Sequence, residues 1–400
     1  MPLSVMPWVA MAVVALAAAA ALGSESQSGP GPGQVLPDSC LLRVERALQL
    51  CRADLPRLQP AAEAAAERLD RGGKLYLAGN RALVSELSGR AGGLMLTQAL
   101  GDKVPDQGDV VIHFPQGQAT LPKAVREAGA LLIVLGEEGR GDYAFSGHAL
   151  EAGISPTLAA AIPAWTFTGE LIAALTRRGK MPVLYESIGL YGGVPRMNRY
   201  LDKGILWHEQ HSVPPIAPGV LGGRYVEAIA AMLRRVEAEE RGKLDTAGRW
   251  ASEAKRAGKR LIMYSMGHLF PDEVGQTAMG KLFASAVWNS GFSSKPPDDA
   301  YHRGDLVIHV GYQHPPTLML ERARAAGARA VYVDILQDRD YVQAPDAIWI
   351  DPMWPWADAC VPIEGYDIPA LAASGVVNGA IAWEIYRCTL AGLGGEAGAP

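Results

Sequence analysis

Two glutamates stand at matching places in two similar stretches of the chain, "LEAGISP" at 150–156 and "IEGYDIP" at 363–369. Glu151 and Glu364 each lie five residues before a proline. A carboxyl group whose pKa is raised toward neutrality by burial can act as a general acid or base. The same carboxylates could instead stabilise the start of a following helix or pair with an arginine. We predict Glu151 and Glu364 as catalytic acid–base residues.

His268 is the third catalytic residue that the sequence predicts. It follows an apolar stretch, and an imidazole there can exchange a proton near neutral pH. His113 and His309 end two near-identical apolar runs, and strand alternation predicts that both are buried and structural. The segment "WHEQH" at 207–211 lacks a third ligand and the i, i+4 spacing of helical zinc sites. No metal is predicted.

The elements that must position these residues occur twice. The hexamer "GDVVIH" at 108–113 returns as "GDLVIH" at 304–309, and each is typical of a buried strand. Upstream of each hexamer lies an apolar stretch that ends in glycine, and a second glycine follows thirteen residues later. Downstream of each come a short helix, an A-G-A-type turn and another strand, and a long apolar helix closes each copy.

This order predicts an α/β fold of two tandem three-layer αβα sandwiches with parallel sheets and a flavodoxin-like topology. Each hexamer is predicted to be the second strand of its sheet. The predicted domains are 39–180 and 223–395, joined by a Pro- and Gly-rich connector at 181–222 that packs between them. Ligands of such sheets bind beyond the carboxyl ends of the strands, so we expect any site to lie there.

Composition restricts the class of protein further. The chain has 400 residues, of which 49% are hydrophobic and 20% charged, so it is globular and long enough for two domains. Its formal net charge of −5 gives no reason to expect a nucleic-acid partner.

The N-terminal segment differs from the rest. Residues 1–23 contain an unbroken apolar run that is short for a membrane span, and they end in small residues typical of a signal-peptidase site. Residues 24–38 are rich in Gly, Pro and Ser, which predicts a flexible linker. We expect an exported protein, periplasmic or extracellular, unless 1–23 stays uncleaved as a membrane anchor.

Four cysteines do not define a disulfide framework. Cys40 and Cys51 fall on one predicted helix, about 16 Å apart, which is too far for a bond between them. Cys360 and Cys388 are not assigned partners, and the absence of C-x-x-C excludes a zinc ribbon or a thioredoxin-type site.

The order strand, glycine turn, helix, "GDVVI", helix, "AGA" and strand resembles the sugar isomerase (SIS) domain. "RAGGL" at 90–94, "IEGY" at 363–366 and "VLYESIGLYGGVPRMN" at 183–198 are similar to motifs of uncharacterised bacterial SIS-domain proteins. The resemblance covers nearly everything from residue 40 onward. It implies phosphosugar binding by Ser and Thr of two loops, isomerisation by Glu and His, and no cofactor. SIS units pair, so a homodimer and a pairing of the two units within one chain both stay open.

The loops after the first two strands depart from the hydroxyl-rich SIS pattern. They read "AGNRALVS" and "FPQGQAT" in the first copy and "SMGHLFPD" and "VGYQHPPT" in the second. Amide and imidazole groups in place of hydroxyls suit a neutral or carboxylated sugar better than a phosphate. The predicted sugar-binding residues are Asn80, Arg81, Gln116, Gln118, Thr120, Ser265, Gln313, His314 and Thr317.

The sequence therefore predicts a protein that binds a small carbohydrate derivative, with any catalysis being aldose–ketose isomerisation through an enediol. Two alternatives stay open: a non-catalytic sugar-sensing or regulatory protein, and an amino-sugar lyase, since N-acetylmuramic acid 6-phosphate etherase shares the SIS domain. Contact with a membrane is expected only through the N-terminal segment.

Overall fold

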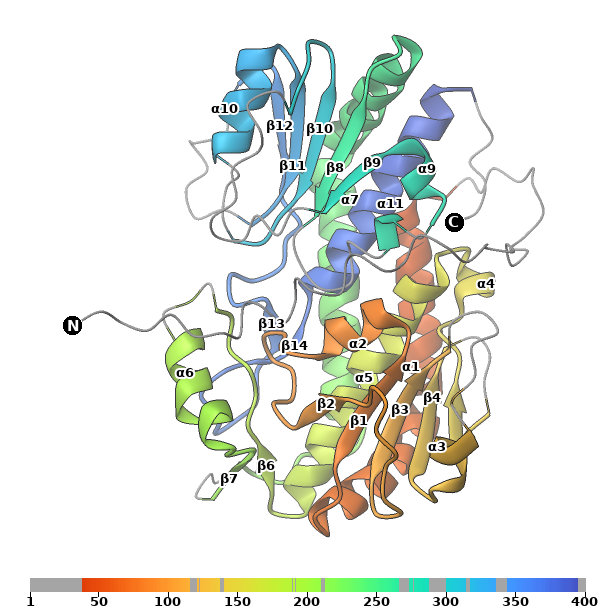
Figure 1. The fold of residues 1–400 in the computed structure, drawn as a ribbon, viewed down its shortest axis with the longest axis vertical. Coiled ribbons are helices and arrows are strands. Elements are labelled where there is room, and N and C mark those ends of the chain that lie inside the picture. The colour runs from red at the N-terminus through yellow and green to blue at the C-terminus, as the bar shows by residue number, and fades with distance from the viewer. Residues whose placement is uncertain are drawn as a thin grey trace.

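The computed structural model describes residues 38–115, 121, 123–136, 140–188, 190, 192–209, 213–265, 273–275, 277–287, 300–313, 317–335 and 344–394. Two five-stranded sheets dominate the fold, and the strands within each pair in parallel. The predicted α/β class with parallel sheets is confirmed (Figure 1).

The two sheets have the same strand order. The first runs β2-β1-β3-β4-β5, and the second runs β9-β8-β10-β11-β12. The strands of the first sheet are β1 (Leu75–Gly79), β2 (Thr97–Ala99), β3 (Val110–Phe114), β4 (Leu131–Leu135) and β5 (Tyr143–Phe145). Those of the second are β8 (Leu261–Ser265), β9 (Ala284–Val287), β10 (Leu306–Val310), β11 (Arg329–Val333) and β12 (Ala347–Ile350). The hexamers form β3 and β10, so each is the third strand and not the second, because a short edge strand precedes it.

The repeated "GD" has a structural cause. Asp109 Oδ1 accepts a hydrogen bond from the amide of Lys74 at 2.8 Å, and Asp305 Oδ1 accepts one from the amide of Arg260 at 3.1 Å. The second oxygen of each aspartate accepts from the amide three residues upstream. Each aspartate therefore fixes the entry of its own strand beside the start of the preceding one, which explains why the letters recur.

Four long helices run lengthwise through the molecule and pack against one another (Figure 1). They are α1 (Cys40–Asp70), α5 (Pro156–Arg177), α7 (Val220–Arg256) and α11 (Ser374–Gly392). On the outer faces lie α3 (Lys123–Glu127) and α10 (Thr317–Ala326), whose Val125 and Met319 join separate small apolar clusters. Each sheet is thus the middle layer of a three-layer arrangement, as the sequence predicted.

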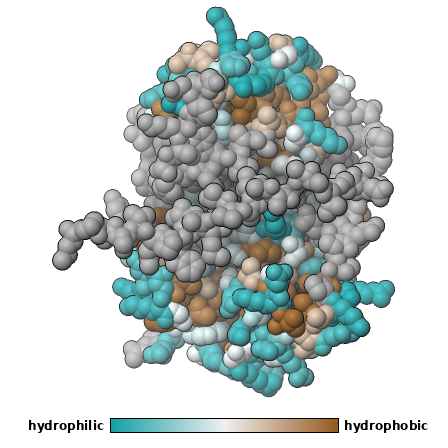
Figure 2. Space-filling model, viewed as in Figure 1, coloured by the Kyte–Doolittle hydropathy of each residue, from teal (hydrophilic) through white to brown (hydrophobic). Residues whose placement is uncertain are grey.

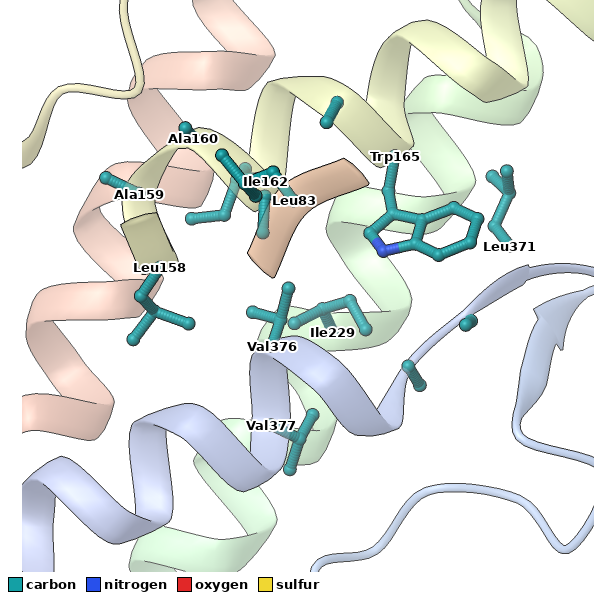
Figure 3. Close-up of a cluster of buried hydrophobic side chains, with 14 of the residues drawn as sticks. Leu83, Leu158, Ala159, Ala160, Ile162, Trp165, Ile229, Leu371, Val376 and Val377 are labelled. Atoms are coloured by element: carbon teal, nitrogen blue, oxygen red, sulfur yellow. The ribbon is translucent and has the colours of Figure 1, made fainter. Parts of the chain in front are cut away.

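The predicted domains 39–180 and 223–395 are called the first and second half below. The central helices of both halves share one core. Figure 3 shows Leu158 and Trp165 of α5 near Leu83 of α2 (Arg81–Leu87), with Ile229 of α7 and Val376 of α11 on the other side. All of these side chains are buried and belong to a single apolar cluster. Burial of this kind is the main favourable term in folding, so neither half completes its core without the other.

The connector contacts both halves. On the side of the first half, the amides of Gly92 and Met95 donate to the carbonyl oxygens of Tyr185 and Val183 at 2.7 and 2.9 Å. Within the connector, β6 (Met181–Pro182) pairs antiparallel with β7 (Trp207–His208), and α6 (Gly193–Arg199) begins at the second glycine of the pair Gly192–Gly193. Arg196 of α6 is buried, and its Nη2 donates to Asp367 at 3.1 Å and to the hydroxyl of Tyr366 at 2.8 Å. The "IEGY" turn is therefore held by the connector.

Two features bear on partners. Among the described helices, α5 alone is long and apolar enough to cross a membrane, but its apolar stretch is buried inside the protein, as in a core helix. On the face shown in Figure 2, the hydrophobic surface of the described residues is divided into separate areas. Within the part of the chain that the structure describes, the exposed large hydrophobic side chains are Leu42, Val104, Leu150, Ile188, Val194 and Ile205.

Candidate acid–base site

A tight turn joins β1 to α2 at the carboxyl edge of the first sheet. Gly79, the last residue of β1, has φ of +98°, and a Cβ there would collide with the carbonyl oxygen of Phe114. Only glycine fits such a turn. It places Asn80, a predicted sugar-binding residue, at the strand ends where open α/β sheets bind ligands.

Asn80 is buried and fixed at both ends of its amide. Its Oδ1 accepts from the amides of Ala82 and Leu83 at 2.9 and 3.3 Å and so caps α2. Its Nδ2 donates to Thr157 Oγ1 at 3.1 Å, in the first turn of α5. The carboxyl edge of the sheet is thereby tied to the start of α5.

A glutamate from the second half reaches this corner. Glu273, in a helical turn at 273–275, accepts through Oε1 from the indole Nε1 of Trp383 at 2.9 Å and from the hydroxyl of Ser155. Ser155 caps α5, since its Oγ accepts from the amide of Leu158 at 3.1 Å. The carboxyl group lies between the halves, since Ser155 belongs to the first half and Trp383 to the second.

Burial raises the pKa of Glu273, and hydrogen bonds from Ser155, Trp383 and Thr157 offset only part of that rise. The side chain is 2% exposed, and no charged side chain among the described residues contributes to the shift. Within the described ranges its second oxygen, Oε2, has no hydrogen-bond partner of ordinary geometry. A carboxyl group of this kind can hold or release a proton nearer neutrality than a surface glutamate.

The first half contains a matching glutamate. Glu86 of α2 is fully buried and accepts from the indole Nε1 of Trp165 at 3.2 Å. It lies against the start of α11, where a Cβ on Gly375 would collide with its carboxyl group. Each glutamate thus pairs with a tryptophan of its own half and packs against the first turn of the other half's last helix.

The surroundings of these two glutamates, called the Glu86 centre and the Glu273 centre below, differ in charge. Arg90 lies 3.9 Å from Glu86 and forms a 2.9 Å ion pair with Asp358, which is also buried. Burial alone would lower the pKa of Arg90, but Glu86 and Asp358 outweigh it and raise that pKa. Asp358 Oδ1 also accepts from the amides of Ala373 and Ser374 at 3.1 and 2.8 Å. The charged groups around Glu86 are therefore side chains of the protein itself, Arg90 and Asp358.

Gln313, another predicted sugar-binding residue, lies next to the Glu86 centre and is engaged within the protein. Its Oε1 accepts from Ser187 at 3.0 Å, its Nε2 donates to the carbonyl of Trp356, and its amide donates to Asp334 at 2.7 Å. Tyr312 stacks on the buried Trp354, with ring centroids 5.4 Å apart. Trp354 thus packs in the core, which is the common role of such aromatics.

Glu151, a predicted catalytic residue, lies on α4 (Ala149–Ala152) with 64% of its side chain exposed. Its Oε2 is 2.5 Å from Nδ1 of His148, whose Nε2 is 2.9 Å from Asp54 on α1. It is not brought together with Asn80 or Glu273 by any described hydrogen bond.

Glu364, the matching residue by sequence, is exposed in a turn between β13 (Ala359–Val361) and β14 (Ala370–Ala372). Arg81 is exposed at the start of α2. Thr317 begins α10 and lines a groove of about 220 Å³ between α10 and β12, and no residue of the Glu273 centre lines that groove. No described hydrogen bond or ion pair joins these three predicted residues to Glu273.

The other predicted residues cannot be placed at the site. Gln116, Gln118, Thr120, His268 and His314 lie outside the described residues, as does the side chain of Ser265 at the end of β8. His113 and His309 are buried in β3 and β10, as expected for structural residues, and burial lowers the pKa of His309 to about 4. Within the described ranges, no group of three or more His, Cys, Asp or Glu residues is placed to hold a metal ion.

Sequence reasoning missed Glu273, Ser155, Thr157 and Trp383. A signal for them does exist in the sequence. Trp165 and Trp383 are each the tenth residue of the long helix that closes their half, and Glu86 and Glu273 follow β1 and β8 by seven and eight residues. Aligning the two closing helices on Trp165 and Trp383 would have shown that these tryptophans correspond, and with them the two buried glutamates.

No protein-family model matches this chain, and no curated protein matches it. Several solved structures are similar to it. One is the C-terminal domain of glucosamine-fructose-6-phosphate aminotransferase from Francisella tularensis, at 10% identity and a TM-score of 0.46, over 88% of this chain and 98% of that one. Another is a candidate phosphosugar isomerase from Clostridium difficile, at 11% identity and a TM-score of 0.45, over 92% and 96% of the two chains. A third is glucosamine-6-phosphate deaminase from Thermotoga maritima, at 11% and 0.39, over 90% and 97%.

Proposed function

We propose that this chain binds a sugar derivative at the corner formed by Asn80 and Glu273, and that it interconverts an aldose and a ketose there. The observation that carries the proposal is the position of Glu273. It is a buried carboxyl group of raised pKa, held without a described cation, at the carboxyl edge of a parallel sheet.

The reaction asks for one proton-exchanging group and no oxidant or reductant. Glu273 acts as the base in its ionised form, after releasing the proton that it carries in the resting protein. It takes the proton from C2 of the open-chain aldose, the C–H electrons form the C1–C2 double bond of an enediol intermediate, and the π electrons of the C1 carbonyl move to O1. The same carboxyl group returns the proton to C1, while the hydroxyl proton of O2 passes to O1, and the ketose results. A carboxylate of raised pKa is a stronger base than a surface carboxylate, which favours the first step.

The hydrogen-bonding side chains of the predicted sugar-binding set would orient the substrate. Asn80 is the described member nearest to Glu273, through Thr157 and the start of α5. The "RAGGL" segment, similar to that of SIS-domain proteins, contributes Arg90 to the neighbouring centre and not to this one. The scarcity of hydroxyls in the loops leads us to propose a free or carboxylated sugar in preference to a sugar phosphate.

A second function, sugar binding without turnover, is favoured by the Glu86 centre. There an equivalent glutamate is closed off by Arg90 and Asp358, so a site of this fold can lose its free carboxyl group. If the Glu273 centre serves only for binding, a sugar would raise the melting temperature without being converted.

One experiment separates the two functions. The protein is incubated with a panel of aldoses, with and without phosphate, in D₂O, and exchange of deuterium at C2 is followed by NMR while melting temperature is measured in parallel. We expect exchange that is lost in Glu273→Gln and kept in Glu151→Gln. Thermal stabilisation without exchange would support binding alone, and neither effect with any sugar would contradict both functions.

We also propose that the protein is exported, since residues 1–23 resemble a signal peptide. A fusion of residues 1–38 to alkaline phosphatase, which is active only outside the cytoplasm, tests this. Activity in the wild-type fusion and its loss when Val13→Asp and Ala17→Asp interrupt the apolar run would support export, while an inactive wild-type fusion would contradict it.

A further inference from the structure

Glu86 and Glu273 occupy matching positions in the two halves. Both follow the strand beside the short edge strand of their sheet, and both accept a hydrogen bond from the tenth residue of a closing helix, Trp165 or Trp383. Both lie against the first turn of the opposite closing helix, through Gly375 and Ser155. The same local geometry is therefore built twice.

The residue four positions further on makes the difference. Four residues after Glu86 stands Arg90, whose guanidinium lies beside the carboxyl group. Four residues after Glu273 stands Thr277, whose hydroxyl donates at 2.7 Å to the backbone carbonyl of Glu273 and supplies no charge. Glu86 therefore has a buried cation next to it, whereas no cation among the described residues lies beside Glu273.

The helix starts differ in the same sense. The amides at the start of α11 are bound by the carboxylate of Asp358, which is paired with Arg90. The start of α5 is capped by the neutral hydroxyl of Ser155, which also donates a hydrogen bond to Glu273. The Glu86 centre is thus built around ionised groups, whereas the donors described at the Glu273 centre are all neutral.

We propose that Arg90 limits the two matching glutamates to a single proton-exchanging carboxyl group: it keeps Glu86 ionised, while Glu273, which has no such cation among the described residues, carries a proton in the resting protein. A buried carboxylate without a cation is costly, and taking up a proton removes that cost. This inference deepens the proposed function, but only its catalytic consequence, one active centre per chain, rests on that function.

The test uses infrared spectroscopy of the full chain without any sugar. A protonated carboxylic acid has a C=O stretch at higher frequency than a carboxylate. The spectra are recorded a little below neutral pH, where surface glutamates are already ionised and do not contribute to this band. We expect a band of a protonated acid in the wild-type protein that Glu273→Gln removes and Glu86→Gln leaves in place. Burial raises the pKa of Glu170 as well, so Glu170→Gln serves as a control and should leave the band assigned to Glu273 in place.

A gain of function makes the test sharper. Arg90→Thr combined with Asp358→Asn gives the Glu86 centre the neutral surroundings of the Glu273 centre. We expect a second protonated-acid band, which the further change Glu86→Gln removes. Absence of the Glu273 band from the wild-type protein, or its loss in Glu86→Gln instead, would overturn the inference, as would a folded double variant with no new band.

If the double variant does not fold, as circular dichroism would show, the single glutamine variants still decide the assignment. The outcome is also separable from that of the proposed function. A Glu273 band in a protein that exchanges no sugar proton would leave this inference standing and the isomerase proposal rejected.

Discussion

Arg90 Nη2 lies 2.9 Å from Asp358 Oδ2, so a guanidinium from the first half is paired with a carboxylate from the second half inside the protein. Both side chains are almost completely buried. Arg90 also donates to the hydroxyl of Ser374, and its guanidinium lies 5.5 Å from the ring centre of Tyr312. The pair links the two halves of the protein at a buried point, where water cannot compete for the hydrogen bonds of the pair.

Replacing Arg90 alone should be strongly destabilising. In Arg90→Met the carboxylates of Glu86 and Asp358 stay buried without their cation, and breaking a buried pair on one side costs about 3 to 5 kcal/mol. Unfolding in urea measures the loss. The matched control is Arg46→Met, which breaks the exposed pair with Asp38 and should cost at most about 1 kcal/mol. Equal losses in the two variants would show that the Arg90 pair does not hold the halves together.

Glu384 should set the acid limit of stability. Burial alone would raise the pKa of Glu384, but Arg387 and Arg241 outweigh it and lower that pKa to about 2. A carboxyl group with a lowered pKa stabilises the fold above its unfolded pKa, and this contribution is lost as the pH falls through the folded value. The lowering corresponds to roughly 3 kcal/mol at neutral pH.

The variant Glu384→Gln should therefore melt at a lower temperature than the wild-type protein at neutral pH, and the difference should shrink as the pH falls toward 2. Melting temperatures across this pH range measure it. Glu364→Gln, on an exposed turn, is the control and should leave the profile unchanged. A difference that stays constant with pH would mean that charge at Glu384 is not the cause.

The fold was predictable because its signals are local. Alternating apolar strands and helices, the glycine at the end of β1 and the aspartates before β3 and β10 all act on residues close by in sequence or on the next strand. Such features leave a readable pattern in the letters. The short strands β2 and β9 were missed, since three or four residues are too few for a period to show.

The candidate site was not predictable in the same way. Glu273 meets Ser155 across 118 residues and Trp383 across 110, and these contacts arise only when the four central helices pack together. Glu151 and Glu364 were instead matched on neighbouring letters. The structure places one on a short helix and the other in a turn beside an antiparallel pair of strands, so similar letters there do not share a local structure.

Glu273 should make stability fall as the pH rises. Because burial raises the pKa of Glu273, its favourable contribution is fully present below the unfolded pKa of a glutamate and is lost as the pH rises through the higher folded pKa. Glutamine keeps an acceptor for Trp383 and Ser155 but does not ionise. The melting temperature of Glu273→Gln relative to the wild-type protein should therefore increase between mildly acidic and mildly alkaline pH. A constant difference across that range would contradict a raised pKa.

Glu151 allows the prediction made from sequence to be tested against the contact seen in the structure. The structure makes it a partner of His148, an imidazole held between two carboxylates at a residue with φ of +60°. Burial alone would lower the pKa of His148, but the hydrogen bonds that its ring donates to Glu151 and Asp54 outweigh burial and raise that pKa. The stabilisation is thus present at low pH and is lost as the pH rises through the raised pKa of His148.

In Glu151→Gln the pKa of His148, followed by NMR of the imidazole, should fall because one of its two carboxylates is gone. The loss of stability should be largest below the ordinary pKa of histidine and vanish at alkaline pH. Asp54→Asn should shift the same resonance in the same direction, since it removes the other carboxylate. If instead Glu151→Gln abolishes proton exchange at C2 of a sugar while the resonance of His148 stays in place, Glu151 is the catalytic base that its sequence position predicts.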